Sequence, residues 1–264
     1  MTDVTAASRD YGALRVEIHP DAQVMGEAAA TAASDTLRAA IAARGSARVV
    51  LATGNSQLPL FAALRRASGI DWKRVEAFHM DEYLGIDADH PASFRRFLRE
   101  HVIEPLGIGK FHGIDGAPAR AEQTMAAYET ALDAEPIDLC CMGIGENGHL
   151  AFNDPPFARF DDERSLRVVS LDEVSRRQQV GEGHFPTLAA VPELAITLTI
   201  PALLRAKRVL VVVPEARKAA AVQRALEGPI QPDCPASILR TAKHATLYLD
   251  RDSAGRLRPL ADDA

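Results

Sequence analysis

The sequence predicts an α/β protein of three layers, in which a mostly parallel, Rossmann-like sheet has helices on both faces. Short β-branched runs alternate along the chain with longer stretches rich in Ala, Leu and Arg. Several of the short runs are apolar at almost every position, as in ARVVLA at residues 47–52 and IDLCCM at residues 137–142. Strands buried on both faces have this character, because helices cover both sides of a parallel sheet. No repeat, low-complexity tract or charge block marks a boundary, so residues 1–264 are expected to form a single domain.

The individual elements follow from the same patterns. The expected strands lie at residues 14–18, 47–52, 75–78, 137–142, 166–169, 195–198, 208–213 and 246–249. The expected helices lie at residues 22–43, 58–67, 93–102, 120–134, 201–206 and 217–226. In sheets of this kind ligands bind beyond the carboxyl ends of the strands, so the loops that follow the strands are the candidate sites.

Composition narrows the class of protein. The 264 residues include 36 acidic and 30 basic side chains, a net charge of −6, which disfavours a broad nucleic-acid surface. Three cysteines, Cys140, Cys141 and Cys234, form neither a disulfide framework nor a paired metal motif, so reduced thiols are expected. The first residues lack a signal-peptide pattern, and no apolar run approaches the roughly 20 residues that span a bilayer. A soluble, cytoplasmic protein is therefore expected, with no membrane partner.

The first candidate loop is Thr53-Gly54-Asn55-Ser56, directly after the apolar run ARVVLA. A glycine lets the backbone approach a ligand, and free N–H groups at the start of a helix suit a phosphate. The pattern GxxxxGK[ST] is missing, so a nucleotide-binding P-loop is not supported. The alternative is an ordinary strand-to-helix turn capped by Asn55 or Ser56.

The second candidate loop contains Asp81 and Glu82, at the end of the run RVEAFHM. Two adjacent carboxylates at a strand end can place one of them in a pocket. Burial raises the pKa of such a carboxyl group, which makes it suitable as a general base. The alternative is a capped helix start or an acidic pair on the surface.

The third candidate loop, GIGENGHLAFNDP at residues 143–155, contains the letters GxGxxG. A dinucleotide site needs a helix that begins inside this motif, and Asn153-Asp154-Pro155 breaks the chain too early for one. The loop instead offers His149 between Asn147 and Asp154. An imidazole oriented by a carboxylate or an amide is an acid–base group near neutral pH.

Two pairs of cations complete the candidates: Arg176-Arg177, and Arg217-Lys218 after the run VLVVVPEA. A lysine at the start of a helix is unfavourable unless an anion binds there, so Lys218 is a candidate for an anion site. The alternative is a solvated face with no role. Arg177 is interpreted as a solvated residue. His149 and His184 lack the paired spacing of metal ligands, so no metal is expected.

These segments resemble a known family. ATGNS, FHMDEYLGIDADHPASF, GIGENGHLAFNDP and PEARKAAAVQRALEG occur in the same order as in the glucosamine-6-phosphate deaminases, and the likeness runs from about residue 47 to residue 249. That family is grouped with the 6-phosphogluconolactonases among the sugar-phosphate isomerase-like proteins. The resemblance implies a cofactor-free aldose–ketose isomerisation with loss of ammonia, which converts glucosamine 6-phosphate to fructose 6-phosphate.

The resemblance also implies roles for single residues. Asp81 would remove the C2 proton of the opened sugar, and His149 would open the ring, with Asn147 and Asp154 as its orienting partners. Contacts to the phosphosugar substrate and its phosphate are expected from Thr53, Gly54, Asn55, Ser56, Glu82, Gly148, Arg176 and Lys218. Members of the family form trimers or hexamers, and some are monomers, so a homo-oligomer is one of the expected states.

This sequence departs from the family pattern at several positions. Many members have Asp where this chain has Asn147, and Glu where it has Asp154. After LDE the family continues T-R-x-x-N-[AS]-R, whereas S-R-R-Q-Q-V-G here places Gly181 where the phosphate-binding arginine would fall. Residues 181–184, GEGH, are expected to form a different lid. No allosteric amino-sugar site can be placed between residues 155 and 169, so no such regulation is expected.

Three alternatives remain open. A 6-phosphogluconolactonase has a loop resembling GxGxDGHxASLFP, whereas this chain has AFNDP in place of ASLFP. A deaminase or isomerase of another phosphosugar would explain the altered segment around Gly181. A non-catalytic sensor of sugar phosphates would keep the pocket, but it has no need of both a base and a proton shuttle.

Overall fold

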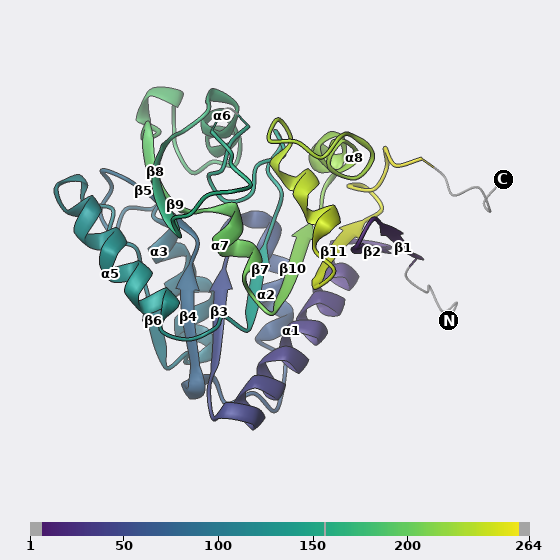
Figure 1. Cartoon of the computed structure of the whole chain (residues 1–264), viewed down its shortest axis with the longest axis horizontal. Helices are drawn as coiled ribbons and strands as arrows, with labels where there is room; N and C mark the ends of the chain where they lie inside the picture. The colour runs from purple at the N-terminus through teal and green to yellow at the C-terminus, as the bar shows by residue number, and fades with distance from the viewer. Residues whose placement is uncertain (1–6, 156, 259–264) are drawn as a thin grey trace.

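A large sheet forms the centre of the molecule (Figure 1). The computed structural model describes residues 7–155 and 157–258. The eight strands lie in the order β1 (Ala7–Tyr11), β2 (Leu14–His19), β11 (Ala245–Asp250), β10 (Arg208–Val213), β7 (Leu139–Met142), β3 (Ala47–Leu51), β4 (Val75–His79) and β6 (Lys110–His112). Every neighbouring pair is parallel except β1 with β2. The carboxyl ends of the parallel strands therefore share one edge.

Helices cover both faces of this sheet, as the sequence predicted. One face carries α1 (Ala22–Arg44), α2 (Leu58–Leu64), α3 (Phe94–Leu98) and α4 (Glu104–Leu106), and the other carries α5 (Ala121–Asp133), α7 (Ile200–Leu204) and α8 (Ala219–Glu227). Alternate residues of a strand point to opposite faces. Val49 accordingly packs in the core with Leu37, and its neighbour Val50 packs in the other core with Val222.

A second, smaller sheet lies above the carboxyl ends of β3 and β4 (Figure 1). It is antiparallel, with the order β5 (Asp81–Tyr83), β9 (Leu194–Leu198) and β8 (Leu166–Ser170). The expected strands at 166–169 and 195–198 belong to this sheet and not to the parallel one. The sequence did not predict β5, because three residues are too few to show a period.

Several element boundaries differ from the expected ones. The helix expected at 93–102 is α3 followed by a π-helical turn, Arg99–Ile103. The helix expected at 217–226 starts as a 3₁₀ turn, Ala216–Lys218, before α8. The short edge strands β1 and β6 were not expected, nor was α6 (Glu173–Gly181), a helix with few apolar residues. Within the described residues, no helix combines the length and the apolar character needed to cross a membrane.

The Glu82 side chain fastens β5 to the start of α3. Its fully buried carboxylate accepts hydrogen bonds from the Ser93 hydroxyl at 2.8 Å and from the backbone N–H groups of Phe94 at 3.2 Å and Arg95 at 3.1 Å. The Arg95 side chain lies 3.4 Å from the same carboxylate. Because Asp81 precedes Glu82 on β5, these bonds also fix the position of Asp81.

Replacing Glu82 with alanine is therefore expected to destabilise the protein. The substitution leaves buried donors without an acceptor, and each such donor costs about 1–3 kcal/mol. Thermal unfolding of Glu82→Ala should show a melting temperature several degrees below that of the unchanged protein. The matched control is Glu100→Ala, since Glu100 is half exposed and pairs with Arg96 in the adjacent turn. Equal melting temperatures for the two variants would contradict the anchoring role.

Candidate active site

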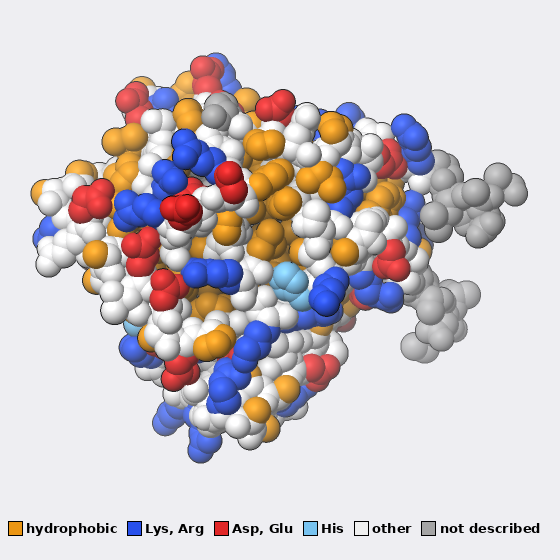
Figure 2. All heavy atoms as spheres, in the orientation of Figure 1, with side chains coloured by type: hydrophobic (Ala, Val, Ile, Leu, Met, Phe, Trp, Pro, Cys, Tyr) orange, Lys and Arg blue, Asp and Glu red, His pale blue; other side chains and the backbone are white. Residues whose placement is uncertain are grey.

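A pocket lies at the edge of the sheet where the parallel strands end. The loops that follow β3, β4, β7 and β10 line it, together with residues of α6 and of the segment after it. Six of the predicted site residues line this pocket: Thr53, Gly54, Ser56, Asp81, His149 and Lys218. Figure 2 shows basic and acidic side chains interspersed over the face of the molecule in view. Because the loops after four different strands line the pocket, the site is formed by segments that are far apart in the sequence.

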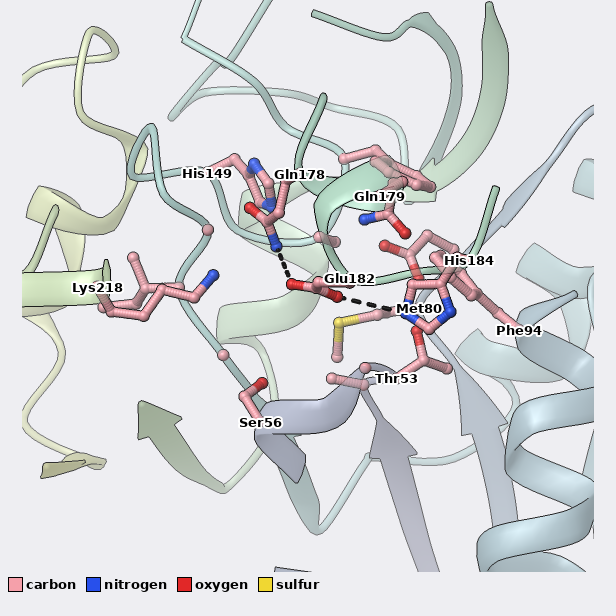
Figure 3. A pocket seen from close by; sticks show the side chains of 18 residues that line it. Thr53, Ser56, Met80, Phe94, His149, Gln178, Gln179, Glu182, His184 and Lys218 are labelled. Carbon is pink, nitrogen blue, oxygen red and sulfur yellow. Dashed lines mark hydrogen bonds and ion pairs between the residues drawn. The ribbon is translucent and has the colours of Figure 1, made fainter. Parts of the chain in front are cut away.

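The loop after β3 and Lys218 form one side of the pocket (Figure 3). The buried Gln57 fastens this loop to β10, because its Nε2 donates to the Val212 carbonyl at 3.2 Å. The Lys218 side chain is buried, and its ammonium group points into the pocket. Burial lowers the pKa of Lys218, although the nearby Glu182 charge opposes this effect. Hydroxyl groups, backbone and an ammonium group thus converge where an anion can bind.

Asp81 opens β5 directly beyond the end of β4, and its side chain is 6% exposed. Among the described residues, no cation pairs with its carboxylate and no donor bonds to it. Burial raises the pKa of Asp81 well above its ordinary value of 3.8, and the neighbouring Glu82 charge adds to the effect. A carboxylate in this state is a stronger base than one in water, which suits the removal of a proton from carbon.

His149 is held against Asp154 and Ser175. Its Nδ1 lies 3.0 Å from Asp154 Oδ1 and 2.9 Å from the Ser175 hydroxyl. Burial alone would raise the pKa of Asp154, but its bonds to His149, Asn147 and Ser175 lower it overall, so the carboxylate is ionised. The Nδ1–H group then donates to Asp154. No group in the described part of the chain bonds to Nε2, which is free to exchange a proton with a ligand.

Two residues of the same loop position this pair. Asn147 Nδ2 donates to Asp154 Oδ1 at 3.0 Å, and Asn147 Oδ1 accepts the backbone N–H of His149 at 3.0 Å. Asn147 therefore orients the pair without touching the imidazole ring. The ring itself lies against Gly145, where a Cβ atom would come within 2.1 Å of His149 Cε1. Only glycine at position 145 leaves room for the ring in this orientation.

Four predicted ligands lie outside the pocket lining. Glu82 caps the start of α3, and Asn55 is exposed. Gly148 packs beside Cys234, and its carbonyl accepts the backbone N–H of Ala236. The Arg176 guanidinium donates to the carbonyls of Leu188 and Val191, both at 3.0 Å. In this structure Arg176 supports the segment after α6 and does not contribute to the phosphate side of the pocket.

The sequence analysis did not identify several residues that the structure brings to the site. Gln178 and Gln179 of α6 line the pocket, and Ser175 bonds to the His149–Asp154 pair. Ser175 stands at the threonine of the pattern T-R-x-x-N-[AS]-R, which was the one signal for it. Glu182 and His184, expected only as part of a lid, also line the pocket.

No group of three or more His, Cys, Asp or Glu side chains in the described ranges is arranged to hold a metal ion. The pocket lining carries acid–base groups and hydrogen-bond donors. Asp81 and His149 lie on the same pocket, whereas Lys218 supplies a positive charge. This arrangement can move protons on a ligand that carries an anionic group.

Comparison with known proteins agrees with this geometry. The profile of the family described as glucosamine-6-phosphate isomerases/6-phosphogluconolactonase matches residues 20–248. A glucosamine-6-phosphate deaminase of Streptomyces coelicolor is 36% identical over 257 residues, which cover 94% of each chain. A glucosamine-6-phosphate deaminase of an Arthrobacter species is 34% identical over 255 residues, again 94% of each chain.

Solved structures show the same fold. A monomeric glucosamine-6-phosphate deaminase superposes with a TM-score of 0.83 at 28% identity, covering 92% of this chain and 99% of that one. A 6-phosphogluconolactonase from Shewanella baltica has a TM-score of 0.73 at 22% identity, covering 89% and 97%, and this likeness concerns the fold alone. Because the family profile spans most of the sequence, the chain belongs to the family of glucosamine-6-phosphate isomerases and 6-phosphogluconolactonases.

Proposed function

We propose that this protein is a glucosamine-6-phosphate deaminase, which converts glucosamine 6-phosphate and water to fructose 6-phosphate and ammonia. The observation that carries the proposal is the placement of Asp81, an unpaired buried carboxylate, on the same pocket as the His149–Asp154 pair. An isomerising deaminase needs both a carbon base and a separate proton shuttle. The names of the curated relatives support this substrate.

The first step is the opening of the sugar ring by His149. Its Nε2 takes the proton of the C1 hydroxyl and returns a proton to the ring oxygen, so that the C1–O5 bond breaks and an aldehyde forms. Asp154 accepts the Nδ1–H bond and stabilises the imidazolium that exists in between. The Asp154 carboxylate reaches the ring at 3.0 Å.

Asp81 then acts on carbon. Its carboxylate removes the C2 proton next to the aldehyde while the aldehyde oxygen takes a proton from solvent, which gives an enol that carries the amine on C2. Protonated Asp81 returns its proton to C1, which gives the C2 iminium, and water adds to C2 as ammonium leaves. Burial without a cationic partner makes Asp81 basic enough for the first of these transfers.

The phosphate of the substrate is assigned to the side of the pocket formed by Lys218 and the loop after β3. The Lys218 ammonium group points into the pocket there, and Thr53 and Ser56 supply hydroxyl donors. Binding the phosphate at this end leaves the sugar carbons to extend toward Asp81 and His149.

We also propose a cytoplasmic location, which the cysteines support. Cys140, Cys141 and Cys234 are all free and buried. Thiols that persist in this state suit a reducing compartment, so we place the reaction in the cytoplasm.

The experiment that tests the proposed function is an assay of ammonia release from glucosamine 6-phosphate, without added nucleotide or metal. A parallel reaction with 6-phosphogluconolactone is followed by acid release. Ammonia together with fructose 6-phosphate is the expected result. Lactone hydrolysis without ammonia would assign the protein to the other activity of its family. If neither assay yields a product, the substrate must be another phosphosugar.

Replacement of Asp81 with asparagine tests the carbon base. We expect kcat to fall by about 10²–10⁴-fold, the usual contribution of a general base, and exchange of the C2 proton with solvent to be lost. Binding of fructose 6-phosphate should change little, because the side chain keeps its shape. The matched control is Asp89→Asn, an exposed aspartate paired with Arg99. Proton exchange that persists in Asp81→Asn, measured by NMR in deuterated water, would exclude Asp81 as the base.

The same variant should also be more stable than the unchanged protein near neutral pH. The unfolded chain ionises Asp81 near 3.8, whereas burial raises the pKa in the folded state. Between these two values the folded state loses stability as the pH rises, because it resists ionisation. Asparagine removes this penalty, so the gain in melting temperature should grow as the pH rises and become constant above the raised pKa. A gain that does not grow at any pH above 3.8 would contradict the raised pKa of the buried carboxyl group.

A further inference from the structure

The carboxylate of Glu182 lies inside the pocket (Figure 3), although no step of the proposed reaction uses it. Its side chain is 7% exposed. Oε1 accepts hydrogen bonds from Gln178 Nε2 at 2.8 Å and from Arg217 Nη1 at 2.9 Å. His184 Nε2 lies 3.3 Å from Oε2. Side chains from three places in the sequence thus hold a negative charge at this point.

This charge occupies the side of the pocket assigned above to the substrate's phosphate. A Cβ atom on Gly54 would lie 4.0 Å from Glu182 Oε2, so the carboxylate stands over the loop after β3. Lys218 faces the same space, and its charge contributes to the lowered pKa of Glu182. Burial opposes that lowering, yet the bonds to His184 and Gln178 and the charges of Arg217 and Lys218 bring the pKa to about 2. The group is therefore ionised near neutral pH.

A phosphate dianion and this carboxylate cannot occupy the same space. Like charges at close range in a pocket cost several kcal/mol. Gly181, the residue before Glu182, carries no charge and so does not offset this repulsion. Gly183, the residue after Glu182, has a φ of 81°, and open space surrounds its Cβ position, so no packed side chain at this residue holds the segment in place. The Arg217 nitrogen that bonds to Glu182 also lies 3.1 Å from Glu146, a residue outside the pocket lining.

We propose that Glu182 is a specificity-determining residue that fills the phosphate subsite until the phosphate of the substrate displaces it. The inference rests on the proposed function, because it takes a phosphosugar as the ligand. A ligand group with one negative charge offers Lys218 no more than Glu182 already does. A phosphate with two charges gains more from Lys218 and the loop than the carboxylate does. The pocket therefore selects dianionic phosphomonoesters over singly charged or neutral sugars.

Calorimetric titration with inorganic phosphate near pH 8 tests this role. Glu182→Gln keeps the shape of the side chain and an acceptor for Gln178 and Arg217, but removes the charge. We expect this variant to bind phosphate at least about tenfold more tightly than the unchanged protein does. It should also bind formate, a monoanion, which the unchanged protein should not bind measurably. The KM for glucosamine 6-phosphate should fall in the same direction.

The matched control is Glu146→Gln. Glu146 pairs with the same Arg217 nitrogen but does not line the pocket, so its phosphate affinity should stay within about threefold of the unchanged protein. The proposal would be overturned if Glu182→Gln bound phosphate no more tightly than the unchanged protein does, or did not bind it at all. It would also be overturned if Glu146→Gln gained as much phosphate affinity as Glu182→Gln. If the unchanged protein released no ammonia while Glu182→Gln bound phosphate more tightly, the proposed substrate would be wrong but the role of Glu182 would stand.

Discussion

The burial of the Asp81 carboxylate without a compensating partner is the constraint on which the active site depends. Three other carboxylates lie buried nearby, and each has donors: Asp154 bonds to His149 and its neighbours, Glu82 to the start of α3, and Glu182 to Gln178, Arg217 and His184. Asp81 alone among these four has no donor within the described residues. A buried charge of this kind costs stability, and such a cost is typical of functional sites.

The rest of the fold holds this unfavourable arrangement in place. Parallel strands of the large sheet end at one edge, and the small antiparallel sheet adds β5 above it. Pairing of Asp81 with Thr197 fixes one side of β5, and the bonds of Glu82 to α3 fix the other. Strand pairing therefore holds the backbone of Asp81 at the edge of the pocket. The proton shuttle and the base come from different strands, which is why their positions can be fixed independently.

The large sheet could be predicted because its strands are buried on both faces. β3 and β10 are apolar at nearly every position, and the helices between them are long enough to show their pattern. The small sheet could not be predicted, since β5 has three residues and pairs with β9, more than a hundred residues later. The polar helix α6 gave no apolar period. The local sequence indicates that a segment forms a strand, but it does not indicate which other strand pairs with it.

For the site, too, local sequence predicted some features, whereas others depend on tertiary contacts. Motif letters singled out Asp81, His149 and Lys218, and these residues line one pocket because each follows a strand of the parallel sheet. They also suggested Arg176 and Glu82 as ligands, but these side chains serve the backbone of neighbouring segments. Whether a polar residue next to a motif faces the ligand or the protein depends on tertiary contacts. The place of Glu182 likewise depends on Arg217, which lies 35 residues further along the chain.

The central claim is most directly tested by the pKa of Asp81 itself. The protein would be labelled with carbon-13 at aspartate carboxyl groups and titrated by NMR, with Asp81→Asn to assign the signal. The account predicts a midpoint well above the ordinary value of 3.8, because burial and the Glu82 charge both disfavour ionisation. A midpoint at or below 3.8 would show that the carboxylate is solvated or paired, and would contradict its role as a buried base.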